Sequence, residues 1–221
     1  PFLGSEVLTL PASWVAAPIT SGMTASDTFH QFKPELERNR LEISLNKNLG
    51  SLFSVDAGYV YEEKKGEKIR GAAFYIDAAN PHSALLPEPV DYTTIEFDAA
   101  LEYAGKNLQF GLNYHLSDFD NEANENGGLT WQNPYSGVFN PGVDYPNGFG
   151  TIGLSPDHQF QQVRARGTYR FTPRIRLQFD GSYGTTEYQD TLPTYTVNPA
   201  LVVTHALPVS SLDDLNTSTF H

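Results

Sequence analysis

Hydrophobic and polar residues alternate along several stretches of the chain, most clearly in GTYRFTPRIRLQFDGSY at residues 167–183. On both sides of Thr172-Pro173, one set of alternate positions is apolar or small and the other is charged or polar. Because successive side chains of a strand point to opposite faces, this stretch predicts a tight hairpin with one apolar and one charged face. Similar alternation predicts a hairpin around Gly50 and another around the AGKN turn at residues 104–107.

Strand lengths and connections indicate where such hairpins belong. Each apolar stripe holds about five residues in about ten positions, enough to cross a bilayer core at a tilt of about 45°. The turns within hairpins are short, whereas the connections between hairpins are long and rich in Asn, Pro, Gly and Asp, an alternation typical of outer-membrane barrels. Strands are expected at about residues 37–46, 51–63, 91–103, 108–117, 158–171, 174–187 and 208–219. Long loops are expected at about residues 1–35, 64–90, 118–157 and 189–206.

The sequence therefore predicts an all-β protein, an antiparallel transmembrane β-barrel of the outer-membrane porin type, with residues 1–221 as one barrel segment. An odd number of strands predicts part of a larger barrel, because an unpaired edge in lipid leaves backbone groups unsatisfied. The chain starts at Pro1 without an initiator Met, which also suggests a segment. A soluble lipocalin-like barrel or sandwich, with the apolar face as its core, remains an alternative.

The alternation also assigns side chains to two walls and to two aromatic girdles at the membrane interfaces. The residues expected to face lipid are Ile95, Phe97, Leu101, Leu108, Phe110, Leu112, Val163, Ile175, Leu177 and Phe179. Those expected to face the lumen are Glu96, Asp98, Glu102, Arg164, Arg166, Arg170, Arg174 and Arg176. The girdle residues are Tyr103, Tyr169 and Phe171 near the short turns, and Tyr59, Tyr61, Tyr114 and Tyr183 toward the long loops.

Composition excludes several kinds of function. A formal net charge of -12 argues against a nucleic-acid partner, which would need clustered Lys and Arg. The chain has no cysteine, so it forms no disulfide, offers no thiolate ligand and attaches no c-type haem. It also lacks a run of about 18 apolar residues, so no transmembrane helix is expected.

Motifs for catalysis or metal binding are weak. GFGTIG at residues 148–153 matches a dinucleotide-binding fingerprint, but the strand and helix that the motif needs are not expected around it. DFDNEANEN at residues 118–126 starts like a calcium loop, but Ala123 stands where the turn needs glycine, so a solvated acidic loop is the simpler interpretation. No metal site, catalytic residue or enzymatic activity is expected.

Six segments, in order, resemble the MtrB/PioB family of decahaem-associated outer-membrane proteins, and the resemblance spans roughly residues 36–219. Members are considerably longer barrels, in agreement with the odd strand count, and some carry an N-terminal Cys-x-x-Cys that this chain lacks. The segments are ERNRLEISLNKNLGSLFSVDAGYVYEEKKGEKIRGAAFY, LPEPVDYTT, YHLSDFDNE, LTWQNPY, LSPDHQFQQVRARGTYRFTPRIRLQFDGSYGTTEYQD and ALPVSSLDDLNTS.

The resemblance implies a porin-like sheath in the outer membrane of a Gram-negative bacterium. Such a sheath surrounds a periplasmic multihaem (decahaem) c-type cytochrome, so that electrons cross the membrane on haem c of the partner and the chain itself binds no cofactor. An extracellular multihaem cytochrome is a further candidate partner, and outer-membrane lipid surrounds the barrel. A stand-alone solute-conducting porin and a soluble β-rich binding domain remain alternatives.

Overall fold

The computed structural model describes residues 7–15, 33–75, 82–124, 128–133, 149–190 and 217–220, and they are almost entirely β-structure. No helix in these residues is long and apolar enough to cross a membrane. The long strands are β2 (Glu35–Leu49), β3 (Phe53–Tyr75), β4 (His82–Ala104), β5 (Leu108–Asn121), β8 (His158–Thr172) and β9 (Ile175–Tyr188). The short elements are β1 (Val7–Leu8), the 3₁₀ turn η3 (Glu122–Asn124), β6 (Leu129–Gln132), β7 (Phe149–Ile152) and β10 (Thr217–Phe220).

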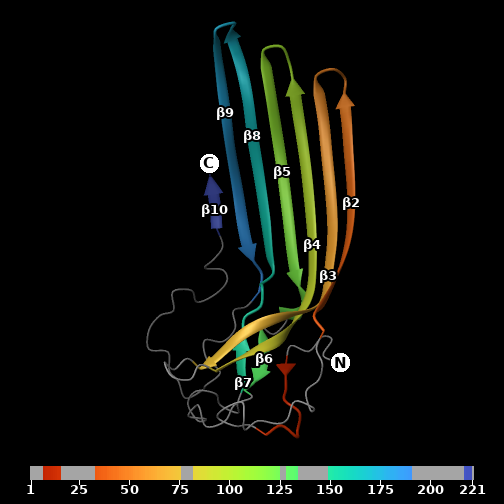
Figure 1. Cartoon of the computed structure of the whole chain (residues 1–221). Coiled ribbons are helices and arrows are strands. Elements are labelled where there is room, and N and C mark those ends of the chain that lie inside the picture. The colour runs from red at the N-terminus through yellow and green to blue at the C-terminus, as the bar shows by residue number, and fades with distance from the viewer. Residues whose placement is uncertain are drawn as a thin grey trace.

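Seven strands form one antiparallel sheet in the order β10-β9-β8-β5-β4-β3-β2. The long strands stand side by side as a wall, with the short β2–β3, β4–β5 and β8–β9 turns at one end and the long connections at the other (Figure 1). The predicted antiparallel hairpins and their short turns are therefore confirmed. Among the described residues β2 and β10 have no outer neighbour, so this sheet is open.

The strand register keeps the alternation in phase across the sheet. Ala99 of β4, for example, lies opposite Ala57 of β3 and Tyr114 of β5, so apolar residues form rows across one face. Large side chains on this face stay uncovered, with Ile43 57%, Ile175 60% and Leu177 53% exposed. No second layer of the described residues packs on this face, so it is not the core of a two-layer domain.

The buried apolar residues lie beyond the long-strand wall, at the end with the long connections. There β3 and β4 continue as a paired hairpin that leaves the direction of the wall (Figure 1) and packs on the small sheet β1-β6-β7. Ala72 contacts Trp131, and Leu129, 0% exposed, packs with Ala123 and Leu154. The chain thus has a membrane-type wall and, at one end, a small extension with its own core.

Gly66 lies where β2 stops pairing with β3, opposite Leu36. Its φ is +138°, and a Cβ at this position would lie 2.1 Å from the carbonyl oxygen of Glu35. Only glycine lacks the Cβ that would clash there, so the close approach of β2 and β3 at this point depends on it.

Two predicted loops contain ordered structure. The prediction of an aperiodic loop at 64–90 was wrong, because residues 64–75 and 82–90 belong to β3 and β4. The 118–157 connection contains the end of β5, η3, β6 and β7. The 189–206 connection lies outside the described residues from 191 onward, as do most of residues 1–35.

The predicted strand bounds agree within a few residues for β2, β5, β8 and β9. Arg174 is the exception among the predicted wall residues, because it lies in the β8–β9 turn and β9 begins at Ile175. Of the predicted strand at 208–219, residues 208–216 lie outside the described part, and β10 covers Thr217–Phe220.

Candidate functional site on the polar face of the sheet

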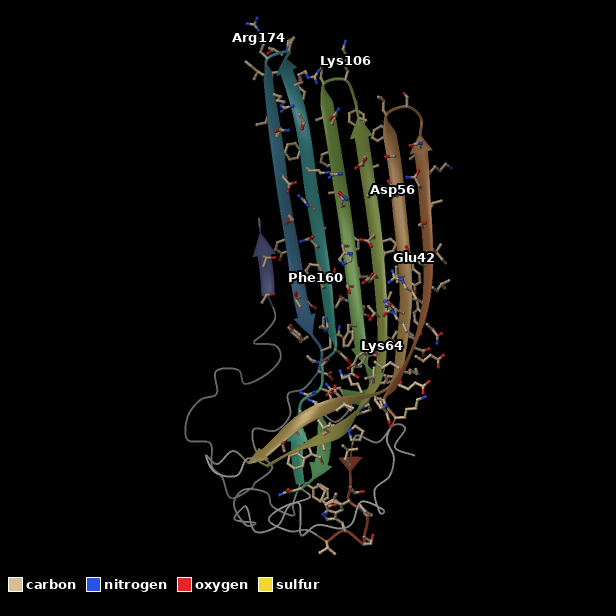
Figure 2. The ribbon with its side chains drawn as sticks, in the orientation of Figure 1. Glu42, Asp56, Lys64, Lys106, Phe160 and Arg174 are labelled. Atoms are coloured by element: carbon tan, nitrogen blue, oxygen red, sulfur yellow. The ribbon has the colours of Figure 1, made fainter. Side chains whose placement is uncertain are left out.

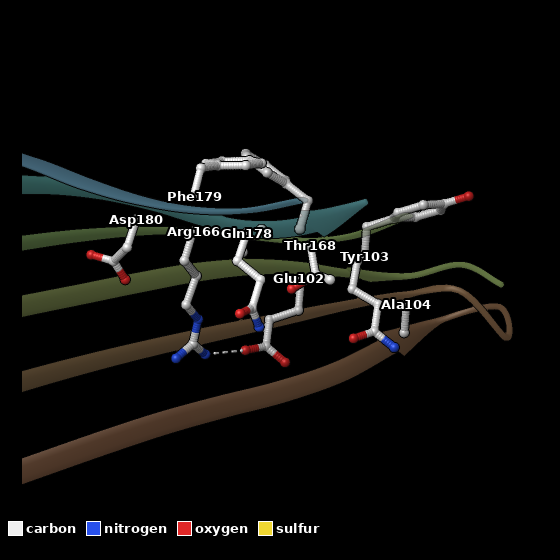
Figure 3. Close-up of a pocket in the computed structure, with 12 residues that line it drawn as sticks. Glu102, Tyr103, Ala104, Arg166, Thr168, Gln178, Phe179 and Asp180 are labelled. Atoms are coloured by element: carbon white, nitrogen blue, oxygen red, sulfur yellow. Dashed lines mark hydrogen bonds and ion pairs between the residues drawn. The ribbon is translucent and has the colours of Figure 1, made fainter. Parts of the chain in front are cut away.

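The charged side chains predicted to share a wall do lie on one face of the sheet. Asp98 is opposite His115, and Glu102 is opposite Gly111, which in turn is opposite Arg166. The row of Ala100, Asn113 and Arg164 lies between these two rows on the same face. Figure 3 shows the two faces at the β8–β9 end, where Glu102, Arg166 and Gln178 leave the sheet on one side and Phe179 leaves on the other. The residues that share the polar face are Glu96, Asp98, Glu102, Arg164, Arg166, Arg170 and Arg176.

Charges in the middle of this face are paired with one another. Arg164 donates to Asp180 across β8 and β9 with Nη2–Oδ2 at 2.8 Å, and Arg166 reaches Glu102 with Nη2–Oε1 at 2.8 Å. Asp98 lies 2.8 Å from Nδ1 of His115. These exposed pairs contribute little to stability, but they compensate the charges of Arg164 and Arg166 in the central wall.

The β2–β3 half of the face also has polar contacts between its strands. Glu62 accepts hydrogen bonds from Arg38 and Arg40, and Asn46 donates to Asp56.

Two shallow depressions mark the face. One, of about 720 Å³, lies over β4, β5, β8 and β9 and includes the Glu102–Arg166 pair (Figure 3). The other, of about 550 Å³, lies between β2 and β8 and includes Asp98, His115 and Arg164. Both are open hollows in a water-facing wall, which suits contact with a large surface more than enclosure of a small substrate.

An aromatic strip on the polar face was missed by the sequence analysis. Phe119 stacks on His158 with ring centroids 5.0 Å apart, and Tyr92 and Tyr188 extend the strip on either side at 5.2 and 5.8 Å. Phe160 lies near His115 at 5.9 Å. Phe160 and His158 are alternate positions of β8 that lie on the same face as Gln162. Extending the alternation back from Gln162 would therefore have assigned both to the polar face.

The predicted girdle residues lie on the apolar face. Near the short turns Tyr103 packs on Phe53 at 4.8 Å, and Tyr169 meets Phe171 edge to face at 4.7 Å. Toward the other end Tyr114 lies opposite Val163, which in turn lies opposite Tyr183. Tyr59 and Tyr61 occupy the next rows on β3, so this line of tyrosines runs obliquely across the strands.

The apolar band is oblique as a whole. At the short-turn end, the apolar stripe of β2 ends at Leu49. The strand register places Phe179 of β9 in the same row as Leu49, and the apolar stripe of β9 continues beyond this row to Ile175. An offset of about four residues, roughly 14 Å, over about five strand spacings, roughly 24 Å, corresponds to a strand tilt of about 30°. This is near the 35–45° typical of membrane barrels. The intervening residues of the row are Phe53, Tyr103, Phe110 and Gly167.

Acidic residues gather where β5 and β8 leave the wall. Asp157 accepts from the Asn121 backbone N–H at 2.7 Å, and Asp190 accepts from the Asp157 backbone N–H at 2.8 Å and from the Asn124 amide at 2.6 Å. Burial, together with the nearby carboxylates of Asp190 and Asp120, raises the pKa of Asp157 to about 6, against the lowering effect of the Asn121 hydrogen bond. Within the described ranges, no three His, Asp or Glu side chains are grouped to hold a metal ion.

The remaining sequence motifs find no catalytic arrangement in the described part of the chain. The GFGTIG segment runs through β7, which pairs with β6. Glu102 and Asp98 are engaged with Arg166 and His115 and do not form a carboxylate pair.

Comparison with known proteins agrees with this architecture. A family model described as an outer-membrane β-barrel porin, MtrB/PioB, matches residues 2–219. The chain is 34% identical over 174 residues to Outer membrane protein MtrB of Shewanella baltica (strain OS185), an alignment that covers 78% of this chain and 23% of the relative. The chain therefore spans about a quarter of the length of that relative.

The match extends over nearly the whole chain, and it confirms the family resemblance, the outer-membrane location and the partial-barrel fold expected from the sequence. It also removes the soluble alternative, in agreement with the uncovered apolar face. The chain belongs to the MtrB/PioB family of outer-membrane β-barrel porins.

Proposed function

We propose that this chain forms part of the wall of a porin-like sheath that holds a periplasmic multihaem c-type cytochrome, so that electrons cross the outer membrane through the barrel. The observation that carries the proposal is the division of one sheet into an uncovered apolar face and a polar face on which Arg164 and Arg166 are each paired with a carboxylate. Family membership supports it, because the family resemblance implies such a partner.

The physical reasoning follows from the two faces. The apolar band and its tyrosines seat the barrel in lipid, where each strand needs an outward apolar stripe. The polar face then lines the lumen. A protein that fills the lumen needs a hydrated, roughly neutral wall, because unpaired charge buried against it would cost desolvation energy. The Arg164–Asp180 and Arg166–Glu102 pairs provide such a wall.

In this proposal the chain acts as a scaffold and not as an enzyme. It binds no cofactor, since the haem groups belong to the partner cytochrome and the chain has no cysteine to attach them. An extracellular multihaem cytochrome is a second candidate partner, at the end that carries the β3–β4 extension.

Purification of the full-length protein in mild detergent tests the proposal. We expect a multihaem cytochrome to co-purify with it, detected by haem staining and by the c-type absorption bands. If no haem protein accompanies the full-length porin under any redox growth condition, the sheath function is refuted.

A stand-alone porin that conducts small solutes is the second candidate, and the open depressions of the polar face favour it. Single-channel conductance of the purified full-length protein separates the two functions. A barrel filled by a cytochrome conducts little, whereas a solute porin conducts strongly with no haem protein present.

A further inference from the structure

Basic residues gather at the short-turn end of the polar face. Arg170 of β8 and Arg176 of β9 lie directly opposite each other on this face, and Arg174 lies in the turn between them. The backbone N–H of Arg170 donates to the carbonyl of Asn107 at 2.8 Å, which brings Lys106 of the β4–β5 turn alongside. Figure 2 shows Lys106 and Arg174 at the tips of neighbouring hairpins. We call Lys106, Arg170, Arg174 and Arg176 the basic rim.

The rim differs from the charges farther along the same strands. Arg164 and Arg166 each have a carboxylate partner at 2.8 Å. Among the described residues no rim side chain forms an ion pair. Glu102 and Asp180, the first carboxylates of β4 and β9 from the short-turn end, are already held by Arg166 and Arg164. Like charges directly opposite on a sheet are unfavourable, so Arg170 and Arg176 raise the energy of the isolated wall.

The rim also borders a hollow. The depression of about 720 Å³ is lined by Thr168 and Gln178, the polar-face positions next to Arg170 and Arg176. A protruding group that enters this hollow from the short-turn end would pass the rim on its way in.

We propose that the basic rim docks a carboxylate-rich surface of the protein that occupies the lumen, and that it steers this protein into the barrel from the periplasmic side, where outer-membrane barrels have their short turns. The inference rests on the sheath function and adds the chemistry of the contact and its position at the short-turn mouth. Charged mouths concentrate partners of opposite sign and raise association rates, an effect that falls steeply with ionic strength.

Lys47 provides a matched control within the same chain. It lies near the β2–β3 turn, at the same end of the sheet, but opposite Val55 and therefore on the apolar face. Lys47 therefore carries a positive charge at the same end of the molecule as the basic rim, but its side chain faces away from the lumen.

The test is the rate at which the cytochrome rebinds to the full-length porin after release in high salt, followed by haem absorbance of the complex. For the wild type we expect rebinding to slow about tenfold between 0.05 and 0.5 M NaCl, as the Debye length shrinks. The double variant Arg170→Gln/Arg176→Gln should rebind about tenfold more slowly at 0.05 M NaCl and lose most of the salt dependence. Lys106→Gln should give a smaller loss, and Lys47→Gln should match the wild type.

Several results would overturn the inference. Equal rebinding rates for the wild type and the double variant, with heat-modifiable gel mobility showing that both are folded, would remove the rim as a docking surface. Unchanged rebinding with loss of co-purified lipid phosphate would show that the rim binds phospholipid headgroups. If no haem protein accompanies the wild type at all, the sheath function fails and this inference fails with it. If the wild type forms the complex and the variants rebind it at the same rate, only this inference fails.

Discussion

Two adjacent alanines in β4 allow a direct test of which face meets lipid. Ala99 lies on the apolar face opposite Ala57 and Tyr114, whereas Ala100 lies on the polar face opposite Asp56 and Asn113. An arginine at Ala99 would project into the hydrocarbon, but an arginine at Ala100 would enter the hydrated lumen beside Asp56. The two variants add the same side chain at the same depth.

The expected magnitude follows from the position of Ala99 in its stripe. The stripe of β4 runs from Ile95 to Tyr103, with Ala99 at its centre. Its length of about 27 Å, tilted by about 30°, spans roughly 24 Å of depth, close to the apolar band of about 25 Å on membrane barrels. Ala99→Arg is therefore a midplane substitution and should oppose folding into the bilayer by about 2–4 kcal/mol, or roughly 30-fold to 900-fold in the equilibrium constant.

The assay is urea-titrated folding of the full-length protein into phosphatidylcholine vesicles, followed by heat-modifiable gel mobility. Ala100→Arg should fold like the wild type. Ile95→Arg, at the end of the same stripe, adds a depth control and should cost about 0–1 kcal/mol for the charge. Equal defects in the Ala99 and Ala100 variants would show that the faces are assigned wrongly, and an Ile95 defect as large as that of Ala99 would refute the assigned depth.

Three further predictions concern the end with the long connections. Gly66→Ala should loosen the β2–β3 pairing by about 1–3 kcal/mol, because its φ of +138° and the Glu35 carbonyl leave no room for a Cβ, and faster amide exchange around Leu36 would reveal it. Leu129→Ala should cost the extension about 2–5 kcal/mol, measured as protease sensitivity with unchanged membrane insertion. The pKa of Asp157 in the folded protein, about 6, exceeds its usual value of 3.8. The contact of Asp157 with Asp190 should therefore be strongest below about pH 4 and weaken as pH rises through 6. Amide exchange at Asn121 should report this pH dependence, and Asp157→Asn should remove it.

The sequence alone determined the hairpins and the two faces of the wall. An alternation of period two assigns each side chain to a face without knowledge of any partner strand, and lipid on one side enforces that alternation strongly. Leu177 and Arg176 were therefore placed on opposite faces before any register was known, and the register agrees with this placement. The turns were also evident, because Gly50 and Thr172-Pro173 interrupt the pattern where the chain reverses.

The extension at 64–90 could not be found in this way. Lys64–Lys68 and the segment before Val90 show no alternation, because outside the membrane neither face of a strand must be apolar. Backbone hydrogen bonds between β3 and β4 decide how these two segments pair. The contact of Ala72 with Trp131, two residues that are distant in sequence, also contributes. Local patterns do not contain such information.

Only the tertiary structure decided which charges on the polar face are partnered. The arginines from Arg164 to Arg176 look alike in sequence, but the strand register brings Asp180 and Glu102 to Arg164 and Arg166. Within the described part of the chain it brings no carboxylate to Arg170 or Arg176. A shift of the register by two residues would keep every side chain on its face and exchange these partners. The faces are thus a property of the sequence, whereas the basic rim is a property of the register, which the turns and the neighbouring strands set together.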